Sequence, residues 1–150
     1  REIRGLMVPV ANGRLLLPNA TVAEVLTYSA PERHENAPDW LLGAVAWRGW
    51  RVPLVSFSRI SGIGREDNFS NTKIAVLKAL GGDPKMPFIA VLTQGFPRLV
   101  TVSAESMVPT DEDGQRARGI LAEVLVRDDP AIIPDLEAIE AMVVKAEDVI

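Results

Sequence analysis

A chain of 150 residues in which 47% are hydrophobic and 24% are charged has the composition of a globular protein and is long enough to bury its own core. It has no cysteine, which excludes disulfides, thiolate metal sites and cysteine nucleophiles. The net charge of −4 argues against a general nucleic-acid binder. Residues 1–110 carry a formal net charge of +3 and residues 111–150 a formal net charge of −7. Such a charge asymmetry more often affects the choice of protein partners and solubility than it indicates catalysis.

The first half of the sequence reads as strands separated by turns. Asn12-Gly13 stands between two apolar segments and is a dipeptide that readily takes the positive φ angles of a tight hairpin turn. Residues 40–47 are a nearly continuous apolar run, which predicts an element buried on both faces. Pro53 cannot donate to a ladder, so its strand should lie at an edge or carry a bulge. The strands predicted in this half are 5–10, 14–17, 22–28, 40–47 and 51–57.

The second half begins with a polar stretch, residues 58–71, which predicts an internal boundary near 58–72 within a single domain of two β subdomains. Apolar residues then recur at helical spacing behind Pro134-Asp135 and predict an amphipathic helix packed on the strands. Short strands with Gly and Pro turns, closed by one helix, indicate an all-β fold of small barrels or a sandwich. The strands predicted here are 73–80, 88–93, 99–102 and 121–126, and the helical stripe is Leu136, Ile139, Met142, Val143 and Ala146.

No combination of residues predicts catalysis. His34, the only histidine, lies in a charged, proline-bounded loop and reads as a solvated side chain rather than a positioned base. One histidine without cysteine disfavours zinc. Residues 61–64 lack the third glycine of a dinucleotide fingerprint and read as a flexible linker, and residues 111–114 read as an exposed acidic turn rather than a calcium loop. We expect no enzyme activity, no cofactor and no metal site.

One charged pair stands out. Glu24 lies within an apolar strand and Arg48 ends the most hydrophobic run in the chain, and charges in such contexts are costly unless they are paired. We therefore expect the two to meet, with the arginine fork gripping the carboxylate and fixing the Arg48-Gly49 turn. Either this is a half-exposed ion pair worth about 1 kcal/mol or less, or it holds a partner-facing loop in shape.

Three tryptophans crowd the same region. Alternation along the strand predicts that Trp40 and Trp47 pack in the core. Trp50 stands at the hairpin tip between Arg48 and Arg51 and is the candidate surface anchor, although core packing is an equal alternative.

Several short motifs follow one another in a fixed order: Val22-Ala-Glu-Val-Leu26, Ala37-Pro-Asp-Trp-Leu-Leu-Gly43, Trp47-Arg48-Gly49, Val52-Pro53-Leu54-Val55, residues 73–77 and Ile133-Pro134-Asp135-Leu136. As an ordered set they resemble the CheW-like family, the small adaptor domains of bacterial chemosensory systems. Residues 17–20, 47–49 and 94–98 are most similar to the ChpC-type branch, which is associated with the system that controls type IV pili. Three departures are Ser56, where most members carry Asp or Asn, Ala46-Trp47, which replaces the usual Asn-Leu, and residues 95–98, which replace a Val-Asp-x-Val stretch.

The resemblance implies two small five-stranded SH3-like barrels packed on a shared hydrophobic core, with a short C-terminal helix. It also implies a non-catalytic cytoplasmic adaptor, recruited to membrane-associated arrays, that bridges the cytoplasmic tips of chemoreceptors to the regulatory domain of a CheA-type histidine kinase. No nucleic acid and no direct membrane insertion are implied. With the tryptophan hairpin added, the expected partner-binding residues are Val22, Glu24, Val25, Gly43, Trp47, Arg48, Gly49, Trp50 and Arg51.

Three alternatives stay open. Small barrels can bind single-stranded nucleic acid through aromatics and a basic groove, but the low aromatic content of 5% and the acidic balance weigh against this. An enzyme of unrecognised type lacks candidate reactive groups. Within the family, the departures at Ser56 and residues 95–98 favour a receptor-only or decoy coupler as the alternative.

Overall fold

The strands of the protein form two sheets. The computed structural model describes residues 1–110 and 116–150. One sheet contains β1 (Ile3–Val10), β2 (Gly13–Pro18), β8 (Arg98–Val102), β9 (Met107–Pro109), β10 (Ile120–Val126) and β11 (Asp129–Pro134). The other contains β3 (Val22–Thr27), β4 (Leu41–Trp47), β5 (Trp50–Val55), β6 (Lys73–Lys78) and β7 (Phe88–Thr93). The strand orders are β8-β1-β2-β11-β10-β9 and β3-β6-β7-β5-β4.

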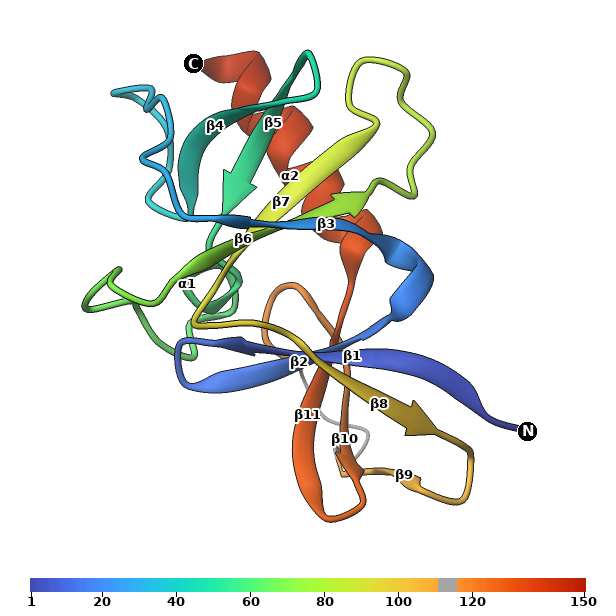
Figure 1. Ribbon diagram of the computed structural model, residues 1–150. Coiled ribbons are helices and arrows are strands. Elements are labelled where there is room, and N and C mark those ends of the chain that lie inside the picture. Colours follow the sequence, from blue (N-terminus) through green and yellow to red (C-terminus); the bar gives the residue numbers. More distant parts are fainter. Residues whose placement is uncertain (111–115) are drawn as a thin grey trace.

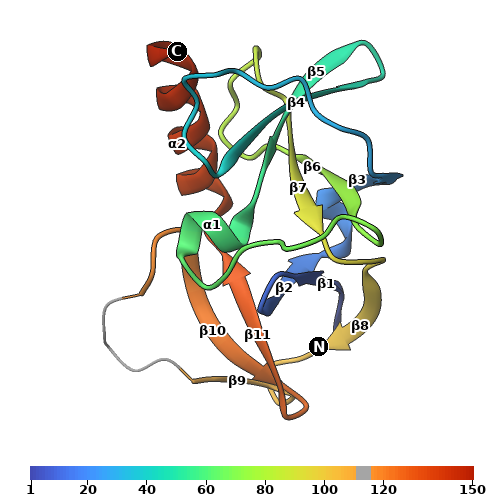
Figure 2. The ribbon, with the colours of Figure 1, turned by 90° about the vertical axis from the view of Figure 1, so that its left-hand side faces the viewer.

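The described residues also contain three helical segments: the 3-10 turn η1 (Asn19–Thr21), α1 (Phe57–Ser61) and α2 (Leu136–Val149). Figure 1 shows the five-stranded sheet stacked above the six-stranded one, and in Figure 2 α2 runs along one side of the five-stranded sheet. The mainly β architecture of two stacked units with one C-terminal helix confirms the predicted fold class. The six-stranded sheet includes the three-residue strand β9.

A single main core joins the two sheets and α2. Val8 and Leu17 come from the six-stranded sheet, Leu77 and Val91 from the five-stranded sheet, and Ile139 from α2, and all five are almost completely buried. Each sheet with its connections forms a unit that has a smaller core of its own. In the unit of the five-stranded sheet this core consists of Val45, Trp47, Val52, Leu54, Ile74, Val76, Ala90 and Leu92. In the unit of the six-stranded sheet it consists of Met7, Leu16, Val102, Val124, Val126 and Ala131. Burial between the units, and not only within them, therefore fixes how the units sit on each other.

The C-terminal helix begins where the sequence predicts. Asp135 is the N-cap, and its carboxylate accepts a hydrogen bond from the Ala138 amide at 3.1 Å. Of the predicted stripe, Leu136, Ile139, Val143 and Ala146 are buried and Met142 is half-buried against the main core.

Glu140 also lies on the buried face of α2, with only 4% of its surface exposed. Its Oε2 accepts the amide of Leu80 at 2.8 Å and its Oε1 accepts the amide of Gly81 at 2.7 Å. A buried carboxylate is tolerated when both oxygens are hydrogen-bonded in this way. The contact ties α2 to the connection between β6 and β7.

Two turn and strand predictions were wrong in detail. The turn between β1 and β2 consists of Ala11 and Asn12, because Val10 pairs with Gly13, and the positive φ of 62° is at Asn12. The apolar run 40–47 is not buried on both faces, because β4 is an edge strand in which Ala46 is exposed.

Pro53 is not on an edge strand, since β5 lies between β4 and β7. Its missing amide is tolerated because the parallel pairing of β5 with β7 begins at Leu54, beyond the proline. The pairing of β5 with β4 does contain a bulge, but it lies on β4, between Leu41 and Gly43.

Residues 58–71 are not wholly irregular, because α1 occupies their start. Ser56 caps α1, and Gly62 ends it at a φ of 77°. These residues connect two strands of the same sheet, β5 and β6, and the subdomain boundary near 58–72 stays a prediction.

The acidic turn 111–114 lies outside the described residues. Within residues 1–110 and 116–150, no helix is long and apolar enough to cross a membrane.

Replacing Glu140 with Ala should lower the free energy of unfolding by about 2 kcal/mol, because two backbone amides lose a charged acceptor. Glu140→Gln, which keeps one acceptor oxygen, should fall between Ala and wild type. Urea unfolding followed by circular dichroism measures both. Glu137→Ala, an exposed glutamate one turn earlier on α2, is the control and should cost less than about 1 kcal/mol. Equal costs at the two positions would contradict the assignment.

Candidate functional site

The β4–β5 hairpin ends in a two-residue turn with an unusual residue in it. Trp47 pairs with Trp50, and the turn residues Arg48 and Gly49 have φ angles of 47° and 82°. Such a turn, with two positive φ angles, follows the twist of a hairpin and favours Asn-Gly. An arginine at the first position is sterically disfavoured, so the turn stores backbone strain.

The predicted contact between Glu24 and Arg48 is present. Oε1 of Glu24 accepts Nη2 of Arg48 at 3.0 Å and also the indole Nε1 of Trp47 at 3.0 Å. The bidentate arginine fork was wrong, because a single guanidinium nitrogen reaches the carboxylate and the indole supplies the second donor. Glu24 belongs to β3 and the other two residues to the β4–β5 hairpin, which lie at opposite edges of the sheet. The carboxylate thus links the two edges of the sheet.

This ion pair is largely exposed to solvent. The side chain of Arg48 is 71% exposed and that of Glu24 is 39% exposed. Exposed pairs of this kind add little stability. What the contact provides is position, since it holds the guanidinium 4.9 Å from the centre of the Trp47 ring.

Three aromatic rings form a row beside the turn. Phe88 contacts Trp47 edge-on at 4.8 Å between ring centres and Trp50 at 6.2 Å. Trp47 is buried, as is Trp40, which confirms the core prediction for both. Trp50 is 42% exposed. We call Glu24, Trp47, Arg48, Trp50 and Phe88 the hairpin site.

Phe88 was not among the predicted site residues. It is the first residue of a strand, and its neighbours in sequence give no indication that it lies between two tryptophans. That position follows from the order of the strands, in which β7 lies beside β5.

Arg51 is held by a second ion pair. Its Nη1 lies 2.9 Å from Oε1 of Glu32, and both side chains are exposed. Glu32 also forms an isolated bridge with Ala44, through the hydrogen bonds Glu32 N to Ala44 O at 2.8 Å and Ala44 N to Glu32 O at 3.0 Å. The loop before β4 is thereby fastened to the edge of the sheet.

This bridge explains why a glycine is needed at position 43. Its φ is 139°, and a Cβ placed on it would collide with the backbone oxygen of Glu32. Glycine at this position therefore lets another segment of the same chain approach closely. Val22 and Val25 are half-buried against the main core and lie outside the hairpin site. Partner binding by these residues stays a prediction.

The Ser56 departure has a local explanation. Ser56 is fully buried, accepts the Arg59 amide at 3.2 Å as the cap of α1, and donates to Oε2 of Glu66 at 2.7 Å. Arg59 Nε in turn donates to Oε1 of Glu66 at 3.1 Å. An aspartate at position 56 would place a second carboxylate against the buried Glu66, whereas serine supplies a donor.

A cavity of about 250 Å³ lies between the C-terminal end of α2 and the loop before β4. Its lining includes Glu32, His34, Arg51 and Glu147. His34 is exposed, and its Nδ1 accepts the Asn36 amide at 3.4 Å. Burial, and secondarily the neighbouring Asp148, raises the pKa of Glu147 above its usual value, and Arg51 offsets part of this effect.

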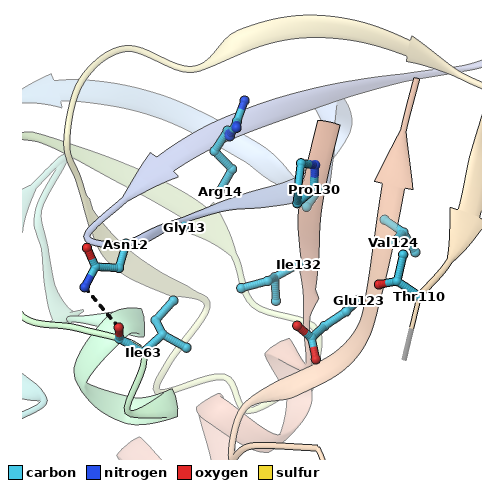
Figure 3. A pocket seen from close by; sticks show the side chains of 10 residues that line it. Asn12, Gly13, Arg14, Ile63, Thr110, Glu123, Val124, Pro130 and Ile132 are labelled. Carbon is cyan, nitrogen blue, oxygen red and sulfur yellow. Dashed lines mark hydrogen bonds between the residues drawn. The ribbon is translucent and has the colours of Figure 1, made fainter. Parts of the chain in front are cut away.

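Another cavity, of about 430 Å³, lies where the β1–β2 turn approaches β10 and β11 (Figure 3). In Figure 3, Ile63, Glu123 and Ile132 approach it from three separate elements, while Arg14 extends away from them. The described lining contains neither histidine nor cysteine. In the part of the chain that the structure describes, no three His, Cys, Asp or Glu side chains are grouped to hold a metal ion.

Comparison with known proteins identifies a matching family and a similar fold. The family model for the CheW-like domain matches residues 4–142. Among solved structures, the crystal structure of the scaffolding protein TtCheW from Thermoanaerobacter tengcongensis is similar in fold, with a TM-score of 0.75 and 15% sequence identity over 91% of this chain and 86% of that chain. No curated protein matches the sequence significantly.

A double-mutant cycle on Glu24→Gln and Arg48→Asn should give a coupling energy below about 1 kcal/mol, falling as salt is added, because the pair is exposed. Arg48→Asn alone should not lower the free energy of unfolding, since asparagine tolerates the positive φ better than arginine does. Urea unfolding at low and high salt provides the measurement. A coupling of several kcal/mol that ignores salt would show that the pair is a structural element of the fold.

The raised pKa of Glu147 predicts a pH-dependent effect of Glu147→Gln. A raised folded-state pKa means that the protonated carboxyl contributes stability below its unfolded pKa, which is lost as pH rises through the folded value. Glu147→Gln should therefore be more stable than wild type at pH 7 and equal to it well below pH 4. Thermal unfolding at both pH values, with Glu2→Gln at an exposed glutamate far along the chain as the control, tests this. A constant difference at both pH values would contradict it.

Proposed function

The chain belongs to the CheW-like domain family, and from this we propose that it is a non-catalytic adaptor that couples chemoreceptors to a CheA-type histidine kinase. The hairpin site is the surface that contacts the regulatory domain of the kinase, and the cytoplasmic tip of a receptor is the second partner. The adaptor acts in the cytoplasm and is recruited to membrane-associated receptor arrays.

The observation that supports this proposal best is the backbone conformation and exposure of Arg48. It occupies a turn position at a φ of 47°, where asparagine or glycine would be less strained, and its ion pair is exposed and adds little stability. Stability does not account for an arginine here, so recognition of a partner is the better explanation. The contacts with Glu24 and Trp47 give the guanidinium a defined position before any partner arrives.

The chemistry of the hairpin site suits a protein surface. Trp50 offers an exposed ring between two arginines, and tryptophan and arginine are the residues that most often dominate interface energies. Each arginine is already oriented by an ion pair to a different segment of the chain. The aromatic ring would supply the buried contact, and the charges would set the orientation of the partner.

The similarity of residues 17–20, 47–49 and 94–98 to the ChpC-type branch supports a narrower assignment, to the chemosensory system that controls type IV pili and twitching motility. On this proposal the kinase and receptor are those of the pilus system.

A receptor-only or decoy coupler is the second candidate. It is favoured by residues 95–98, which depart from the family pattern and expose Phe96 to 70%, with the Lys73 ammonium 4.9 Å from the centre of its ring. Such a protein would bind the receptor and leave the kinase unbound.

Calorimetric titration of the chain against the isolated regulatory domain of the cognate kinase tests the proposal. Wild type should bind with micromolar affinity, and Trp50→Ala and Arg48→Asn should each weaken binding about tenfold or more, as truncation of an interface anchor does. Phe96→Ala and Arg98→Ala are matched controls, an exposed aromatic and an exposed, ion-paired arginine outside the hairpin site, and should change affinity less than twofold.

No binding by a folded wild-type protein would refute kinase coupling, and binding to the receptor tip alone would then establish the decoy reading. Equal losses in the test variants and the controls would remove the hairpin site from the interface. Salt-sensitive binding to single-stranded DNA would favour a nucleic-acid-binding module instead.

A further inference from the structure

A second surface, made of none of the hairpin-site residues, is an apolar groove between the two sheets. It has a volume of about 360 Å³ and lies where the end of β2, the β6–β7 connection, the start of β10 and the start of α2 meet. Its apolar lining comprises Leu16, Leu17, Leu80, Leu121, Ile133 and Leu136. We call it the inter-sheet groove.

Two leucines of the groove are exposed although each is attached to a different sheet. Leu80, which follows β6, is 55% exposed, and Leu121 of β10 is 53% exposed. Single exposed leucines are ordinary on protein surfaces. Two that line one cavity together with buried apolar residues form a continuous patch, which is typical of an interaction site.

The two leucines are held in place by backbone contacts. The amides of Leu80 and Gly81 both bond to the buried carboxylate of Glu140. On the other wall, the amide of Asp135 donates to the Gly119 oxygen at 2.8 Å, two residues before Leu121. The groove is therefore formed before any ligand is present, which lowers the entropic cost of binding.

The charges at the groove are acidic. Asp135 and Glu137 are the charged residues of its lining, and Asp135 is engaged as the cap of α2. Glu137 is exposed and forms no ion pair with the described residues. Beyond Glu137, the adjoining cavity adds Asp83 and Asp148 against the single Lys145. A ligand complementary to this surface is apolar at its centre and basic at its flank.

We propose that the inter-sheet groove binds a segment of a partner protein in which one large apolar side chain is flanked by lysine or arginine. The apolar side chain enters between Leu80 and Leu121, and the basic residue faces Glu137. Phosphate-rich ligands fit poorly, because the acidic rim repels nucleic acid and anionic lipid headgroups. The contact is additional to the adaptor function and does not depend on it.

Titration of the ¹⁵N-labelled chain with a synthetic peptide of Lys-Leu-Leu-Lys repeats, followed by NMR, tests the proposal. The amide signals of Leu80, Leu121 and Glu137 should shift together. A peptide with Glu in place of Lys should not produce these shifts. Leu121→Ser and Leu80→Ser should each weaken binding about tenfold, and Glu137→Lys should weaken it most at low salt.

Leu99→Ser is the matched control, because Leu99 is also 53% exposed but lies on β8, outside the groove. It should change affinity less than twofold, and urea unfolding should show that every variant is folded. Absence of shifts, equal binding of the glutamate peptide, or equal losses in Leu99→Ser and Leu121→Ser would each overturn the proposal. Shifts at the groove caused by anionic vesicles or single-stranded DNA would do the same.

Discussion

Two strands at the centre of the five-stranded sheet are buried on both faces, and the rest of the structure depends on this. Ile74 and Val76 of β6 point into the interior of their own unit, while Ala75 and Leu77 point into the main core. The residues of β7 alternate in the same way. One sheet thus forms a wall of two cores, so neither unit is independent of the other. Binding surfaces are left to the strand ends, the edges and the connections.

The two surfaces described above lie at such places. The hairpin site occupies the end of the β4–β5 hairpin, and the inter-sheet groove opens where connections from both sheets meet α2. Each is fixed by a glutamate, Glu24 in the exposed site and Glu140 beneath the groove. In both cases the carboxylate positions groups that contact solvent, and a protein that works by holding partners in a fixed geometry needs such preformed surfaces.

Local chemistry predicted the elements whose signals are local. The cap at Asp135 and the meeting of Glu24 with Arg48 follow from residue type and context, and the structure confirms both. Strand β11 was missed because Pro130 and Pro134 argue against a strand, yet both lie near its ends, away from Ile132, where β11 pairs with β2. Helix α1 had a readable signal in Ser56 and Gly62, a cap and a terminating glycine six residues apart.

Other features depend on the order of strands, which no local pattern specifies. The position of Phe88 between two tryptophans and the exposure of β4 at an edge both follow from the pairing of β5 with β7. Glu140 is intermediate, since a charge within the apolar stripe of a helix indicates a buried acid but not its partner. Partner binding by the predicted residues depends on the surface of a second molecule, which the sequence of this chain does not describe.

The chain enters the six-stranded sheet twice, first with β1 and β2 and again with β8 to β11, whereas β3 to β7 are consecutive. During synthesis all strands of the five-stranded sheet are available once Thr93 has left the ribosome. In contrast, β2 can complete its pairing only after β11 has been synthesised, more than a hundred residues later. This long-range closure is the slow kind of contact in folding kinetics. Until then β2 presents an unpaired, apolar edge, a period in which the nascent chain is exposed to aggregation.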